Sequence, residues 1–289
     1  AEIKVGGFSG YLCELLVLNY GSFIEVLRSA VEWKERRVID YEGHHERIDD
    51  AKKVFEEPFV MVDPVDKGRN VAAAVRKEKL DEFVAASRTF LKAPDLKFFY
   101  PREVEALETT ELVNKINARG SATVFISFEG VPAVPDVLWG QLYKSQRALR
   151  KLIRQHDFTV LRDKVWSNEK NLNIFIFEVE NRFLPNMKRH LGPPLRKKQE
   201  CENFLRKHVG ADSTVSGPRV EEGRWVVDVK RKHTDAVNLL NEKLGGGGGS
   251  VGVAELVSKA VADSMEVLVN DEALKLYSAN PEFAKFLTE

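Results

Sequence analysis

The chain has 289 residues, of which 43% are hydrophobic and 30% are charged, and its formal net charge is zero. This composition is typical of a globular protein with room for two or three domains. Its apolar runs are shorter than the roughly 18 residues of a membrane helix, and its two cysteines exclude a disulfide framework, so we expect a cytoplasmic protein without a membrane partner.

The charges are distributed unevenly along the chain. Residues 1–110 contain 17 Lys or Arg against 21 Asp or Glu, residues 111–249 contain 24 against 16, and residues 250–289 contain 3 against 7. The middle of the chain therefore carries a net charge of +8, and each end carries −4. A basic middle segment suggests that a polyanion contacts only part of the surface.

The first 100 residues show mainly helical patterns. Ser9 can cap one helix, and the spacing of Ser22 and Glu25 matches a capping box that starts a second. An apolar strand candidate at 59–62 is followed by a Pro-Gly turn and a further helix. We predict a helical domain at 1–100.

The next segment, 101–181, alternates between strand and helix. Val124, Ile126 and Phe128 recur at the period of a strand, a long helix is expected at 135–155, and strands are expected at 158–165 and 172–179. A β-α-β-β order is typical of an antiparallel sheet with helices on one face. The predicted fold class is α+β, with a mostly helical domain followed by this sheet domain.

The remaining chain divides into a basic tail at 182–244, a glycine-rich linker at 245–250 and a helical segment at 251–289. The alternation of Trp225, Val227 and Val229 predicts a strand pair in the tail. Five consecutive glycines and a serine predict a flexible linker. This run and the missing initial Met favour a laboratory linker, and a natural mobile loop is the alternative.

Two N-terminal segments carry a family resemblance. They are Gly-Phe-Ser-Gly-Tyr-Leu-Cys-Glu-Leu-Leu at 7–16 and Val-Asp-Pro-Val-Asp-Lys-Gly-Arg-Asn-Val-Ala-Ala at 62–73. In order and spacing they resemble the archaeal (class I) CCA-adding enzymes, the tRNA nucleotidyltransferases that add C, C and A to the 3′ end of tRNA. In that family a catalytic head with metal-binding acidic residues precedes the first segment. Because the chain begins just before the match, we expect the central and C-terminal regions without that head.

The second segment contains the best candidate for ligand recognition. Pro64 and Gly68 tighten the chain after a strand, so the turn is expected to present Arg69 and Asn70 at its rim. The alternative is a structural ion pair between Arg69 and Asp63 or Asp66. Because its donors can also reach a ligand from this rim, Asn70 is a second candidate for nucleotide binding. The resemblance implies that Arg69 reads the base of the incoming CTP or ATP.

The long helix at 135–155 has one apolar face and one basic face. No acidic residue occurs between Asp136 and Asp157, and the basic face contains Lys144, Arg147, Arg150, Lys151 and Arg154. A solvated face normally mixes signs, because like charges at i,i+4 repel, whereas an unmixed stripe fits a row of phosphates. The resemblance places Lys144 and Arg147 near the tRNA acceptor stem.

The tail contributes further candidates for RNA binding, Lys197, Lys198 and Arg224. Basic runs of this kind are most often solvated surface. The resemblance implies that this part of the chain grips the elbow of tRNA, where a helical RNA is recognised through its shape, phosphates and 2′-hydroxyls.

The sequence contains no Asp-x-Asp after a Gly-Ser turn, no zinc spacing and no phosphate-binding loop motif. We therefore expect no catalytic or metal-binding residues and no cofactor bound by this chain alone. Mg²⁺ with CTP or ATP is expected only when a separate head-domain polypeptide is supplied, so the chain alone should be inactive. The alternatives are a non-catalytic tRNA-binding protein and a partner-docking module, which an exposed apolar patch at Phe8, Tyr11 and Leu12 would favour. A homodimer is also left open.

Overall fold

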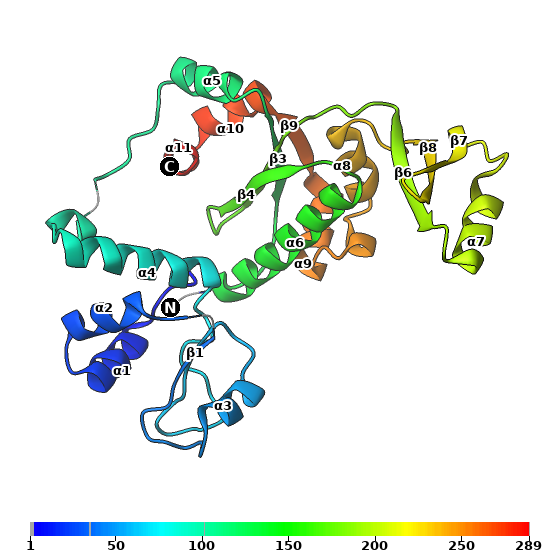
Figure 1. The fold of residues 1–289 in the computed structure, drawn as a ribbon. Coiled ribbons are helices and arrows are strands. Elements are labelled where there is room, and N and C mark those ends of the chain that lie inside the picture. The colour runs from blue at the N-terminus through cyan, green and yellow to red at the C-terminus, as the bar shows by residue number, and fades with distance from the viewer. Residues whose placement is uncertain (1–2, 35, 101, 289) are drawn as a thin grey trace. The chain divides into compact units, whose positions relative to one another are not determined.

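The computed structural model describes residues 3–34, 36–100 and 102–288. The chain forms two compact units: unit 1 comprises residues 1–104 and 134–140, and unit 2 comprises residues 105–133 and 141–289 (Figure 1). Helices and sheets occur in both units, which confirms the predicted α+β class. Ala1, Pro101 and Glu289, where predicted domains begin or end, lie outside the described residues.

Unit 1 is mostly helical. Ser9 Oγ accepts a hydrogen bond from Leu12 N at 3.1 Å, and Ser22 Oγ accepts one from Glu25 N at 3.3 Å, so both serines cap their helices. The Glu25 carboxylate pairs with Arg28 at 2.6 Å instead of completing the predicted capping box. The unit contains two short parallel strands, β1 (Arg37–Ile39) and β2 (Phe59–Met61), and five helical elements: α1 (Gly10–Tyr20), α2 (Phe23–Val31), α3 (Ile48–Val54), α4 (Lys77–Lys92) and the 3-10 turn η1 (Leu96–Phe98).

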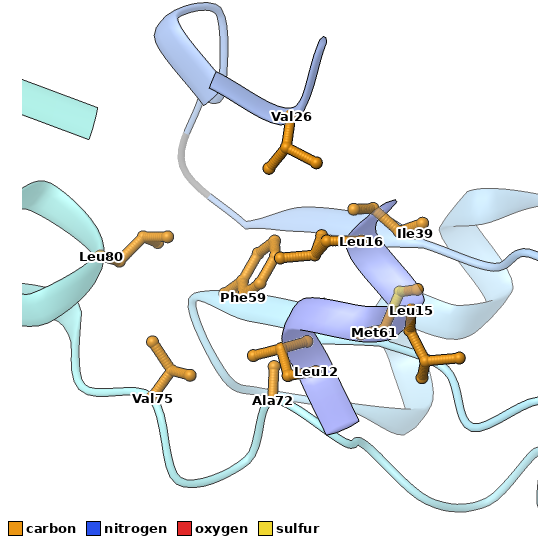
Figure 2. Packing of buried hydrophobic residues seen from close by; sticks show 10 residues of the cluster. All are labelled: Leu12, Leu15, Leu16, Val26, Ile39, Phe59, Met61, Ala72, Val75 and Leu80. Atoms are coloured by element: carbon orange, nitrogen blue, oxygen red, sulfur yellow. The ribbon is translucent and has the colours of Figure 1, made fainter. Parts of the chain in front are cut away.

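The core of unit 1 forms around β2. Figure 2 shows Phe59 and Met61 surrounded by apolar side chains of α1, including Leu12 and Leu16. The ring of Trp33 stacks on Phe59 with a centroid distance of 4.8 Å. Because β2 is buried at all three positions, the turn that follows it begins from a fixed point.

The main sheet of unit 2 is antiparallel, in the order β4-β5-β3-β9. Its strands are β3 (Ala122–Glu129), β4 (Val160–Ser167), β5 (Leu172–Val179) and β9 (Glu266–Val269). Every residue of β5 is buried, although successive side chains point to opposite faces. The sheet is therefore covered on both faces, and the expectation of helices on one face was wrong.

Helices of unit 2 cover this sheet. In the chain, β9 lies between the helical elements α9 and η3. Phe283 of α11 packs against Phe125 on one face, while α6 carries the long apolar stripe predicted for 135–155. The segment 251–289 was predicted to be helical throughout, but β9 pairs with β3 at Val124–Ser127. The helical elements are α5 (Thr109–Ala118), α6 (Pro135–Gln155, whose residues 135–140 belong to unit 1), α8 (Ala236–Leu244), η2 (Gly249–Val251), α9 (Glu255–Ser264), η3 (Asn270–Ala273), α10 (Leu274–Ala279) and α11 (Pro281–Thr288).

The tail forms a second antiparallel sheet in the order β6-β8-β7, with one helix against it. Phe204 of the helix packs on Val227 and Val229 of the central strand. The elements are β6 (Met187–Pro194), α7 (Lys198–His208), β7 (Thr214–Glu221) and β8 (Arg224–Lys230).

The glycine run is a packed turn between α8 and η2, not the flexible linker that its composition predicted. Gly247 N donates to Leu244 O at 2.7 Å, and Val253 N donates to Gly248 O at 3.2 Å. Gly247 and Gly248 have φ angles of +87° and +74°, and a Cβ on Gly247 would lie 2.3 Å from Ser258 O. Glycine is needed here for left-handed backbone and close packing.

Among the described residues, no single helix is long and apolar enough to cross a membrane. The pair α1 and α2, bent by 86° at a short break, meets the length and composition test only when taken together.

Candidate functional site

A cavity of ≈700 Å³ in unit 1 brings the two N-terminal segments together. Ser9 and Tyr11 of the first segment and Gly68 and Arg69 of the second line it. Tyr11 is 41% exposed, so its ring is available to a ligand. Segments separated by about 60 residues in the sequence therefore contribute to one site.

Hydrogen bonds within the turn hold the second segment in place. Asp63 N donates to Arg69 O, and Arg69 N donates to Asp66 O, both at 3.0 Å. The carboxylate of Asp66 also accepts from Gly68 N at 2.9 Å. The turn is closed at both ends, as the Pro-Gly pattern predicted, and the backbone of Arg69 is fixed beside the cavity.

Arg69 combines the two alternatives left open by the sequence. One terminal nitrogen lies 3.2 Å from Asp63 Oδ2, so the predicted ion pair with Asp63 is present. The Arg69 side chain is nevertheless 64% exposed, whereas that of Asp63 is 4% exposed. The carboxylate therefore holds one edge of the guanidinium, and the other donors remain beside the cavity.

Asn70 is placed differently from the expectation that its donors would reach a ligand. Its Oδ1 accepts from Met61 N at 3.0 Å and from Ala72 N at 2.9 Å, and its Nδ2 donates to Phe59 O at 3.1 Å. The side chain is buried. The amide ties β2 to the chain beyond the turn because these backbone groups need buried partners.

On α6, the predicted basic stripe lies on the surface. Lys144, Arg147, Lys151 and Arg154 are all exposed, and among the described residues the first three have no ion-pair partner. Arg154 donates to Val160 O at 3.4 Å. Arg150 does not belong to the exposed set, because its guanidinium turns to Asp163 on β4 at 2.6 Å.

The three candidates in the tail have different surroundings. Lys197 and Arg224 line the same cavity of ≈550 Å³ beside α7, whereas Lys198 is exposed at the start of that helix. Lys197 pairs with Glu200 at 2.7 Å, and Arg224 Nε donates to Gly192 O at 3.0 Å. The sequence did not predict that His190 would line this cavity as well.

Sequence reasoning also missed Phe55 and Glu57, which line the cavity in unit 1. Neither lies in a periodic pattern or a motif, so only the return of the chain from α3 to β2 brings them there.

The apolar patch expected for a docking module is mostly absent from the surface: Leu12 is fully buried, and Phe8 packs on Phe83 with a centroid distance of 4.6 Å.

The acidic residues and histidines do not gather into a metal site within the described ranges. No group of three or more His, Cys, Asp or Glu side chains is arranged there to hold a metal ion.

Family models match most of the chain. Residues 1–100 match the tRNA nucleotidyltransferase second domain, and residues 119–270 match the CCA-adding enzyme C-terminal domain. These matches cover the unit 1 cavity, the basic stripe of α6 and the tail.

Archaeal relatives are similar over nearly the whole chain. The CCA-adding enzyme of Methanosarcina mazei is 38% identical over 287 residues, which cover 99% of this chain and 60% of that protein. The CCA-adding enzymes of Methanothermobacter thermautotrophicus and Pyrobaculum aerophilum are each 39% identical, over 84% and 86% of this chain and 51% and 54% of their own lengths. The chain thus spans little more than half the length of these relatives. With both family models in agreement, it belongs to the CCA-adding enzyme family, as its two N-terminal segments predicted.

Proposed function

We propose that this chain is the part of a cytoplasmic CCA-adding tRNA nucleotidyltransferase that binds tRNA and recognises the base of the incoming CTP or ATP. The observation that carries the proposal is the position of Arg69, whose exposed guanidinium shares a cavity with the first segment. Catalysis then requires a head domain outside this chain.

In the proposed nucleotide site, Arg69 reads the base or a nearby phosphate. Its planar fork of donors suits both the acceptor edge of a base and a phosphate. Asp63 restrains one edge of the fork, so less rotamer entropy is lost when a ligand binds. The buried Asn70 side chain stabilises the turn that carries Arg69. The exposed ring of Tyr11 provides a surface on which a base can stack.

The proposed tRNA site follows the basic stripe of α6. Lys144, Arg147, Lys151 and Arg154 are separated by three or four residues, so they rise about 15 Å along one side of the helix. Phosphates of the acceptor stem would neutralise this stripe and release counterions. Lys197, Lys198 and Arg224 of the tail would meet the elbow of the tRNA.

The residues present do not form a site for Mg²⁺, because no suitable cluster of ligands occurs in the described parts of the chain. We therefore assign Mg²⁺ to a head domain outside these residues. The role of this chain is to hold the 3′ end of the tRNA and to orient the nucleotide.

The proposal is tested by incorporation of labelled CTP and ATP into tRNA that lacks its CCA end. We expect no incorporation by the chain alone and incorporation when a head-domain polypeptide from a related CCA-adding enzyme is added. Incorporation by the chain alone would contradict the requirement for a head. If the pair is also silent although the chain binds tRNA, the chain is a non-catalytic tRNA-binding protein.

A further inference from the structure

A third cavity, of ≈310 Å³, lies in unit 2 and has an apolar floor. It is bordered by Ile116 of α5, by Phe125 and Ile176 of the sheet, and by Leu287 of α11. Its volume is at the lower end of the range for small-molecule sites. None of the residues that line this cavity belongs to the basic stripe of α6 or to the tail cavity.

Four cationic side chains line the same cavity: Lys115, Arg119, Arg162 and Lys164. Arg119 and Arg162 both bind the carboxylate of Glu178, which is 5% exposed. Arg119 uses two nitrogens, with Nε 2.6 Å from Oε1 and a terminal nitrogen 3.1 Å from Oε2, whereas Arg162 uses Nε. The two terminal nitrogens of Arg162 have no partner among the residues that the structure describes.

Positive charge remains at this cavity after every described ion pair is counted. Lys115 pairs with Glu111 at 3.0 Å, and Asp163 pairs with Arg150 at 2.6 Å. Among the described residues that line the cavity, Arg119, Arg162 and Lys164 then remain against the carboxylate of Glu178, which leaves +2. Burial alone would raise the pKa of Glu178, but hydrogen bonds from Arg119, Ser121 and Arg162 outweigh it and lower this pKa to about 2, so that carboxylate is ionised at neutral pH.

We propose that this cavity binds a small phosphomonoester that carries an apolar or aromatic group. A phosphomonoester has a charge of about −1.5 to −2 at pH 7, which matches the excess of +2, whereas a carboxylate supplies half of it. The outer donors of Arg162 provide the fork geometry for the phosphate oxygens. The floor formed by Ile116, Phe125 and Ile176 would cover the apolar group. Glu178 is a positioning residue, because it holds both guanidinium groups in place.

Isothermal titration of the full chain with 1-naphthyl phosphate tests this assignment. We expect one binding site for 1-naphthyl phosphate. Inorganic phosphate lacks the group that contacts the apolar floor, and neutral 1-naphthol lacks the phosphate, so each should bind at least about tenfold more weakly. Equal affinity for inorganic phosphate would contradict the role of the apolar floor.

Two variants locate the site. Arg162→Ala removes the free fork and is expected to weaken binding about tenfold or more. Thr123→Trp places a large ring in the cavity without changing its charge and should abolish binding; circular dichroism checks that it folds. Arg189→Ala is the matched control, because Arg189 has a similar exposure to Arg162 and also binds one carboxylate, but it lies outside the cavity. Binding that survives Arg162→Ala, or no binding by the unaltered chain at about 1 mM ligand, would overturn the proposal.

Discussion

At the scale of single residues, the exposed Arg69 and the buried Asp63 form an asymmetric pair. Asp63 also accepts a hydrogen bond from Val65 N at 2.9 Å, so its carboxylate is fixed within the turn. The negative charge of Asp63 holds the Arg69 guanidinium beside the cavity. Arg69 can therefore form a structural ion pair and still contact a ligand.

Replacing Arg69 by Lys separates these two roles. Lysine keeps a positive charge beside Asp63 but lacks the planar fork, so the affinity of the chain for CTP in the presence of tRNA should fall about tenfold. The midpoint of urea unfolding should hardly change. Calorimetry measures the first quantity, and Arg102→Lys, at an exposed position outside the cavity, is the control. Unchanged CTP affinity in the Arg69 variant would contradict its role in recognition.

Asn70→Ala should act on stability. The change removes three hydrogen bonds and leaves the buried Met61 N, Ala72 N and Phe59 O without that partner, which should lower the free energy of unfolding by roughly 2–4 kcal/mol. Asn114→Ala, on an exposed position of α5, should change it by about 0.5 kcal/mol or less. Urea unfolding followed by circular dichroism measures both. Equal stability of the two variants would show that the Asn70 amide does not hold the turn.

Asn70 also shows what the sequence could not predict about the site. Turn chemistry located the segment and placed Arg69 at the cavity, because Pro and Gly restrict the backbone locally. The direction of the Asn70 amide depends on unpaired backbone groups of β2, which no local pattern reveals. The same limit applies to Arg150, whose partner Asp163 lies on a strand that follows the helix.

At the scale of elements, the glycine turn 245–249 is ordered by packing although its composition predicts flexibility. The run is typical of a flexible linker, yet its backbone is hydrogen-bonded and Gly247 touches α9 through Ser258. Strand β9 was missed for a related reason. It has only four residues, and its partner β3 lies about 140 residues earlier, so local periodicity says little about it. Helix α6 and the strands β3 and β5 were predicted because their periodic patterns extend over many residues, whereas α7 and α8 were not predicted.

Two alanine substitutions in this run test the packed turn. Gly247→Ala should lower the free energy of unfolding by about 2–4 kcal/mol, because it combines a positive φ with a clash against Ser258 O. Gly246→Ala is the matched control: a Cβ there meets no atom within 4 Å, so its effect should be within about 1 kcal/mol. Thermal unfolding compares them. A flexible linker would tolerate both substitutions equally.

At the scale of the whole molecule, the excess positive charge lies in residues 111–249, and part of it is used structurally. Glu178 on β5 joins Arg119, which follows α5, to Arg162 on β4. A single buried carboxylate thus connects a helix end with two strands of the main sheet.

This cluster predicts an acid-labile contribution to stability. The folded pKa of Glu178 is about 2, below the ordinary value of 4.5, so its contribution is complete above about pH 5 and is lost as the pH falls towards 2. Glu178→Gln should therefore unfold at lower urea concentration than the unaltered chain at pH 7, and the difference should shrink between about pH 5 and pH 3. Unfolding midpoints measured across this range check the sign. A difference that stays constant with pH would contradict the assignment.

If tRNA binds along the basic stripe of α6, as proposed, the affinity of this chain for tRNA lacking CCA should depend strongly on salt concentration. Each phosphate contact contributes about 0.7–0.9 to the slope of log affinity against log salt concentration. Alanine at Lys144, Arg147, Lys151 and Arg154 should therefore weaken binding and reduce the slope by about three. Alanine at four exposed cations elsewhere, Lys92, Arg102, Lys170 and Lys285, should leave the slope nearly unchanged. Equal slopes for the two fourfold variants would contradict the account.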